Sequence, residues 1–171
     1  MAKPDLATIP AFYHKYVNLV EEDTAVDALE KNSAATRSFF AAIPEEKWEY
    51  RYAEDKWSIK ELVQHMVDTE RIFSYRALCF ARGEKQSLPG FDENVYAASS
   101  GADRRTKDEL IEEFDAVRKA TEILFRSFDE DQLSKTGHAN NNPVSVNGIG
   151  FITAGHVLHH LNVLRERYLQ A

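Results

Sequence analysis

The chain has 171 residues, of which 43% are hydrophobic and 29% are charged, with only 7 glycines and 5 prolines. This composition is too apolar for a disordered chain and too poor in turn residues for an all-β fold, so it predicts one helical domain over residues 1–171. The formal net charge of −7 gives no general support for binding a phosphate backbone, and we expect no nucleic-acid partner.

Two helices are expected in the first part of the chain. A short helix around residues 10–20 precedes a long one that runs from about Thr24 to Ala42. Apolar residues recur at helical spacing in the long helix, and Pro44 lies just past its end.

The next helix has the clearest start in the chain. Ser58 is followed three residues later by Glu61, which is the capping-box arrangement, in which each side chain accepts a hydrogen bond from the other residue's backbone N–H. The helix is expected to end near Gly83, and its apolar residues form one broad stripe that should face the core.

Turn-forming residues such as Pro89 and Gly90 predominate from 84 to 100, and we expect a long loop of the kind that often serves a site. A third helix is predicted to begin near Thr106, where Glu109 completes a second capping box, and to end around Ser127.

The segment from 136 to 148 is expected to be a second polar loop. Ser145 is a suitable cap for a last helix that runs to about Leu169. Four long helices with two long connections predict an all-α four-helix bundle.

The first ten residues, MAKPDLATIP, lack the apolar core of a signal peptide, and no stretch approaches the roughly 18 apolar residues that span a bilayer. We therefore expect a cytoplasmic protein with no membrane partner. Cys79 is the single cysteine, which excludes an intrachain disulfide, and its apolar neighbours predict a buried thiol rather than a reactive one.

Histidines in the last predicted helix suggest a metal site. His156 and His160 lie four residues apart in the sequence GHVLHH, so both project from one helix face and have the spacing of two imidazoles that chelate one ion. No glutamate follows His156, which excludes the helical metalloprotease motif. Taken singly, a histidine on an apolar stripe is more often a hydrogen-bonded core or boundary residue than a metal ligand.

A third ligand must come from another part of the fold. His65 is the only other histidine on a core-facing helical stripe, because His14 and His138 lie in less constrained segments. If the two helices pack together, His65 completes the chelate, and three imidazoles leave a coordination position open for water or substrate. His159 lies on the flank of the stripe, so we expect it behind the ligands or at the surface.

Several polar residues are candidates for catalysis beside such a metal. Asp68, Glu70 and Glu93 are candidate general bases for a hydrolase, and Tyr75 and Arg76 are candidates for orienting an anionic substrate. An ion-paired network is the alternative for the charged residues of this helix, which are Glu70, Arg71 and Arg76.

Two roles are open for five residues of the first long loop: they border a pocket beside the metal, or they cap the loop. These residues are Phe91, Asp92, Glu93, Asn94 and Tyr96.

Three stretches of the chain resemble a known family. They are KWSIKELVQHMVDTERIFSYRALCFARG, LPGFDEN and GFITAGHVLHHLNVLRERY. With their spacing, they are similar to the DinB-like superfamily of YfiT-type metalloproteins over about residues 10–168. The resemblance implies a bundle in up-down-down-up order and a homodimer. It also implies a divalent metal, with zinc and nickel the first candidates, held by His65, His156 and His160.

The resemblance also implies a reaction class. Members with assigned activity are thiol S-transferases, mycothiol-dependent isomerases and a few metal-dependent hydrolases. We expect a metal-dependent S-transferase that activates a low-molecular-weight thiol toward an electrophile, because an open metal position lowers the pKa of a bound thiol. A metal-dependent hydrolase is the alternative.

A non-catalytic metal-binding or dimerisation module is the remaining possibility. Structural zinc sites are normally closed by four protein ligands, which argues against a purely structural metal. The aromatic residues that would form a dimer interface, or else pack against the end of the bundle, are Trp48, Tyr50, Tyr52 and Trp57.

Overall fold

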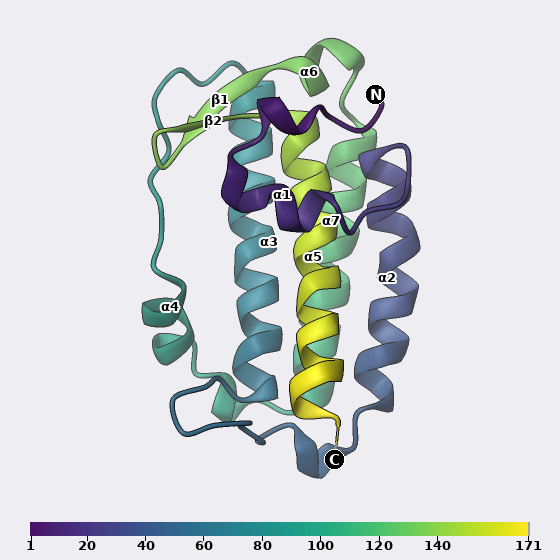
Figure 1. Cartoon of the computed structure of the whole chain (residues 1–171), viewed down its shortest axis with the longest axis vertical. Coiled ribbons are helices and arrows are strands. Elements are labelled where there is room, and N and C mark those ends of the chain that lie inside the picture. Colours follow the sequence, from purple (N-terminus) through teal and green to yellow (C-terminus); the bar gives the residue numbers. More distant parts are fainter. Residues whose placement is uncertain (171) are drawn as a thin grey trace.

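The computed structural model describes residues 1–170, and four long helices form its body. These are α2 (Ala25–Ala42), α3 (Ile59–Ala81), α5 (Lys107–Arg126) and α7 (Val146–Val163), and a π-helical turn over Leu164–Tyr168 extends the last. In Figure 1, α2 and α7 run in one direction while α3 and α5 run in the other, so the chain order is up-down-down-up. The predicted all-α four-helix bundle is confirmed.

The helix starts follow the predicted capping residues. The Thr24 side chain accepts from the backbone N–H of Asp27 at the start of α2, and complete capping boxes begin α3 at Ser58 and α5 at Thr106. Each box satisfies two backbone N–H groups that a helix start otherwise leaves unpaired. Within residues 1–170, no helix has both the length and the apolar character needed to cross a bilayer.

The apolar core forms two clusters along the bundle. One is centred on Phe73, Phe80 and Phe125, and the other on Phe40 and Phe114. Along α3, α5 and α7, buried polar side chains lie between the residues of the two clusters, among them those of Glu70, Arg118 and His156. Because buried polar groups require partners, the side chains of this middle layer group together, and they form a histidine cluster and a buried ion pair.

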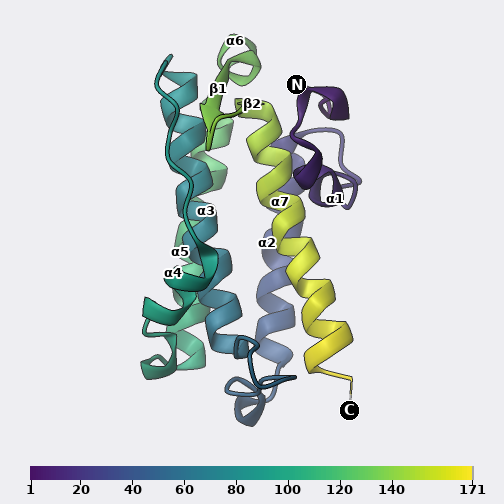
Figure 2. The ribbon, with the colours of Figure 1, turned by 60° about the vertical axis from the view of Figure 1, so that its left-hand side comes forward.

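The expected loop from 84 to 100 is partly wrong, because residues Glu93–Ser99 form a short helix, α4. The Asp92 side chain accepts hydrogen bonds from the backbone N–H groups of Asn94 and Val95, which caps this helix. A helix this short is marginal alone. It forms because it packs along the outside of α3, with Ala97 buried in the contact, as Figure 2 shows.

The second expected loop, from 136 to 148, is also wrong. After a short helix, α6 (Glu130–Ser134), the strands β1 (Thr136–Ala139) and β2 (Asn142–Ser145) form an antiparallel hairpin. Asn140 and Asn141 connect the strands with φ values of 50° and 61°. Two consecutive residues with positive φ make the tight turn that matches the twist of a hairpin, and asparagine tolerates this conformation better than most residues.

The N-terminal segment is less helical than expected. The predicted helix over 10–20 is limited to a 3₁₀ turn at Ala11–Tyr13 and one turn of α1, His14–Val17. This segment lies across α7 in Figures 1 and 2. Gly155 makes the approach possible, because a Cβ at this position would lie 2.0 Å from the Tyr16 carbonyl oxygen. The segment therefore forms a wall beside His156.

Candidate metal centre

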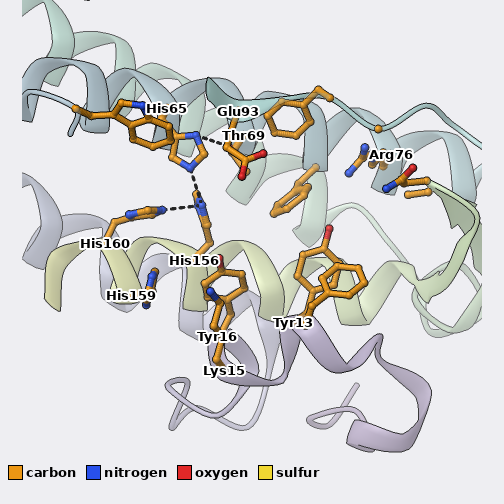
Figure 3. A pocket seen from close by; sticks show the side chains of 17 residues that line it. Tyr13, Lys15, Tyr16, His65, Thr69, Arg76, Glu93, His156, His159 and His160 are labelled. Carbon is orange, nitrogen blue, oxygen red and sulfur yellow. Dashed lines mark hydrogen bonds between the residues drawn. The ribbon is translucent and has the colours of Figure 1, made fainter. Parts of the chain in front are cut away.

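Three histidine side chains from two helices converge in the middle of the bundle. α3 supplies His65, and α7 supplies His156 and His160 one turn apart. The Nε2 atom of His156 lies 3.1 Å from that of His65 and 3.0 Å from that of His160, with one ligand atom of each residue within 4.8 Å of the others. Figure 3 shows the rings directed toward a common point.

The three imidazoles fit a divalent metal better than they fit one another. The Nε2 atom of His156 faces two other Nε2 atoms, but a neutral imidazole nitrogen has either one hydrogen or one lone pair, so one of the two contacts stays unsatisfied. Nitrogen ligands about 2.0 to 2.1 Å from a metal lie about 2.9 to 3.3 Å apart at ordinary coordination angles. The observed separations of 3.0 and 3.1 Å fall in this range.

The composition of the cluster limits its chemistry. Within residues 1–170, no carboxylate or thiolate joins the three imidazoles. Imidazole suits zinc and nickel, and a set of three protein ligands leaves room for water or substrate.

Burial keeps these histidines in the neutral form that binds metal. His65, His156 and His160 are 9%, 5% and 9% exposed. Desolvation lowers the pKa of His65 from 6.5 to about 4 and holds the pKa values of His156 and His160 well below 6.5, where the positive charges of neighbouring histidines lower them further. Neutral imidazoles at pH 7 require no deprotonation before they bind an ion.

These shifts predict how the metal-free protein responds to acid. Unfolded histidine binds a proton near pH 6.5, whereas folded His65 does so only near pH 4, so the unfolded state holds more protons between these values. The free energy of unfolding should therefore fall on acidification through this window, with His65 contributing on the order of 3 kcal/mol.

Urea unfolding of the metal-free protein at several pH values, with chelator present, measures this effect. Comparison of the wild type with His65→Gln isolates one histidine from the carboxylates that titrate at lower pH. The slope against pH should be smaller in the variant, and equal slopes would contradict the burial argument.

Neighbouring rings hold the imidazoles in place. The Trp57 ring packs against His65 with centroids 4.7 Å apart, and the Tyr16 ring packs edge-on against His156 at 5.4 Å. The Thr69 hydroxyl lies 3.5 Å from Nδ1 of His65, which is a weak contact. Packing, more than hydrogen bonding, therefore sets the orientation of the histidines.

A cavity of about 390 Å³ lies against the histidine cluster, and this size is typical of small-molecule sites. Its walls come from α3 and Trp57 just before it, α7, the N-terminal segment, the loop that leads into the first residue of α4, and the turn of the hairpin. Figure 3 shows the lining side chains, which are Phe12, Tyr13, Lys15, Tyr16, Trp57, His65, Thr69, Phe73, Arg76, Gly90, Phe91, Glu93, Ala139, Asn140, His156, His159 and His160.

Two of the candidate catalytic residues line this cavity, and three do not. Glu93, the first residue of α4, and Arg76 are on its wall, together with Phe91 of the same loop. Asp68 is absent from the wall and accepts a hydrogen bond from Gln64, and Tyr75 is 58% exposed away from it.

Glu70 also lies away from the cavity. It forms a two-point ion pair with Arg118 of α5. The ion-pair alternative thus describes Glu70, although its partner is on another helix. Of the loop residues, Asp92 caps α4 rather than bordering the cavity.

Sequence reasoning missed part of the wall. Thr69 and Phe73 follow His65 at steps of four, so helical spacing alone was a sufficient signal for them. Tyr13, Lys15 and Tyr16 had no such signal, because their place depends on the N-terminal segment crossing α7 at a glycine. His159 is half-buried on the wall but outside the group of three.

Comparisons with known proteins agree with the fold. No curated protein matched the chain. Among solved structures, the chain is similar to YfiT from Bacillus subtilis, described as a probable metal-dependent hydrolase with an unusual four-helix bundle topology, with a TM-score of 0.74, 14% identity, and coverage of 83% of this chain and 82% of that one.

A mycothiol-dependent maleylpyruvate isomerase is a second similar structure, with a TM-score of 0.68 and 12% identity. The alignment covers 81% of this chain but only 58% of the isomerase. Because the two structures are only 14% and 12% identical to this chain, these likenesses establish the fold alone. The family model of the DinB superfamily matches residues 28–164, which include all three clustered histidines. The chain therefore belongs to the DinB superfamily.

Proposed function

We propose that this protein is a metal-dependent S-transferase, in which His65, His156 and His160 hold a divalent metal, zinc or nickel, that activates a low-molecular-weight thiol for attack on an electrophile. One observation carries the proposal: three neutral imidazoles converge on a point at the wall of a cavity large enough for a small molecule. Three ligands leave the side toward the cavity for a substrate.

A divalent metal in this position would supply Lewis-acid activation, lowering the pKa of a thiol so that thiolate is present at neutral pH. The remaining roles belong to the chain. Its own Cys79 is not on the cavity wall, so the nucleophile must come from outside. The aromatic side chains of Trp57, Phe73 and Phe91 provide apolar contact for the bound molecules and exclude water.

A metal-dependent hydrolase is the second candidate, and Glu93 favours it. Water attack requires a group that accepts a proton, and Glu93 is the only carboxylate on the cavity wall formed by residues 1–170. The description of YfiT as a probable metal-dependent hydrolase points the same way. A thiol needs no protein base once its pKa is lowered, and the mycothiol dependence of the second similar structure supports the thiol reaction.

One assay separates the candidates. Zinc-loaded and nickel-loaded protein is incubated with chlorodinitrobenzene and a panel of small thiols, and in parallel with chromogenic esters. We expect thioether formation that needs both metal and thiol: the C–S bond forms, chloride leaves with the bonding electron pair, and the thiol proton passes to solvent. His160→Ala should abolish it, whereas His138→Ala, which removes an exposed histidine of β1 away from the cavity wall, should retain it.

Other outcomes select other functions. Ester hydrolysis without thiol that is lost in Glu93→Gln would replace the transferase by a hydrolase. No turnover in either assay, with metal bound, would favour a non-catalytic metal-binding module.

A further inference from the structure

Arg76 is a buried cation with no acidic partner in the part of the chain described. Its side chain lies on the cavity wall, and the residue is only 5% exposed. No carboxylate of residues 1–170 lies within salt-bridge distance of it, whereas the other buried arginine, Arg118, is clamped by both oxygens of Glu70. A buried charge without a counter-ion is costly, so an unpaired one beside a cavity indicates a ligand of opposite charge.

The present contacts of Arg76 leave most of its donors unused. One Nη2 hydrogen bond goes to the Pro89 carbonyl oxygen at 2.7 Å, and the guanidinium lies over the Phe73 ring, 5.8 Å from the centroid. Among residues 1–170, the titratable side chain beside it is Tyr13, whose hydroxyl can accept one guanidinium hydrogen bond but is uncharged at neutral pH and so is no counter-ion. A guanidinium has five N–H donors in a planar fork that suits a carboxylate, and few of them are occupied here.

The position of Arg76 defines a second end of the cavity. His65, Thr69, Phe73 and Arg76 follow one another at steps of four, four and three, so they share one face of α3. The eleven residue steps from His65 to Arg76 span about 16 Å along the helix axis. Figure 3 shows the guanidinium well apart from the histidines, with aromatic side chains between them.

We propose that Arg76 binds the anionic end of the substrate, so that the site takes an elongated small molecule with a carboxylate at one end and a thiol at the other. The thiol end rests on the proposed function, but the anion site at Arg76 does not. The apolar middle of such a molecule would lie against Phe73 and Phe91. Because a guanidinium binds phosphate as well as carboxylate, phosphonate analogues of the same length form a separate arm of the test.

The competing reading is that Arg76 only anchors the loop before α4 through the Pro89 carbonyl. That role predicts altered stability in Arg76 variants but no preference for anions. The two readings are therefore separated by comparing ligands that differ only in charge.

Binding is measured calorimetrically on zinc-loaded protein with mercaptocarboxylates of increasing chain length and with mercaptoalcohols of equal length. The long acids, mercaptooctanoate and mercaptoundecanoate, should bind about 10- to 100-fold more tightly than the matching alcohols, as expected for a hydrogen bond to a charged group. Mercaptoacetate is too short to reach both ends and should show no such preference. Preference for the phosphonate arm would assign the anion as phosphate-like.

Arg76→Gln should remove the acid preference, and Arg76→Lys should retain part of it. Arg71→Gln is the matched control, since it removes one positive charge from the exposed side of the same helix. Metal affinity should be equal in all four proteins, which shows that the histidine cluster is intact.

A second measurement does not depend on metal. Octanoate should raise the unfolding temperature of metal-free wild-type protein more than octanol does, and Arg76→Gln should abolish the difference. This result together with absence of metal binding would remove the proposed transferase but keep the anion site. Equal binding of long acids and alcohols by wild-type protein, with thiol binding intact, would overturn the inference while leaving the proposed function in place.

Discussion

Replacement of His156 by alanine is expected to weaken binding of zinc or nickel by more than about 100-fold, since even loss of a hydrogen bond that supports a ligand costs roughly 10- to 100-fold. His156 is the central member of the cluster, because its Nε2 atom faces those of both His65 and His160. Without it, the pair of imidazoles one turn apart on α7 is lost, and only His65 on α3 and His160 on α7 remain.

Metal affinity is measured by competition with a chromogenic chelator, and folding of the variant by circular dichroism. His159→Ala is the matched control, because it removes a neighbouring half-buried imidazole that lies outside the group of three. It should keep the affinity within about tenfold of the wild type, the lower end of the range for supporting residues. If the two variants lose metal equally, the cluster is not the ligand set.

The second large effect concerns stability. Glu70→Ala should lower the free energy of unfolding by about 3 to 5 kcal/mol, because it leaves the Arg118 charge buried and unpaired. Arg118 is completely buried, its Nε and Nη2 atoms donate to the two Glu70 oxygens at 2.8 and 2.7 Å, and Nη1 donates to the Leu29 carbonyl oxygen at 3.2 Å. The pair thus joins α2, α3 and α5.

Denaturant unfolding of Glu70→Ala, Arg118→Met and the double variant Glu70→Ala with Arg118→Met tests this account. The double variant should be more stable than the sum of two single losses implies, because no lone charge remains. Metal affinity of Glu70→Ala, measured where it is folded, should match the wild type. A loss of affinity would instead indicate that Glu70 acts at the metal.

Local chemistry explains why most of the bundle was predictable. Ser58 with Glu61 and Thr106 with Glu109 each determine a helix start through bonds between residues three apart, and both boxes are present. The same holds for His156 and His160, whose relative position follows from helical geometry alone.

The connections were harder to predict, because their structure depends on distant partners. The helix α4 is too short to form alone and relies on α3, and the hairpin was misread because its signal was two asparagines rather than Asn-Gly. Gly137 lies directly under the Phe80 ring, where a Cβ would come within 2.1 Å of the ring, so the hairpin depends on α3 as well.

The candidate site was likewise predictable only where local helical geometry determines it. Periodicity brought His65 and Arg76 onto one face of α3 but could not distinguish Glu70, which lies on the same helix and faces α5 instead. Lys15 and Tyr16 reach the cavity only because Gly155 admits the N-terminal segment. That contact joins residues far apart in the sequence, and no local pattern encodes it.

Crystals of the protein grown with zinc, with anomalous diffraction recorded on both sides of the zinc absorption edge, test the central claim most directly. One strong peak is predicted about 2.0 to 2.1 Å from the Nε2 atoms of His65, His156 and His160, with the cavity side occupied by water or a small molecule. A peak elsewhere, or a fourth protein side chain bound to the metal, would contradict an open site that activates a thiol.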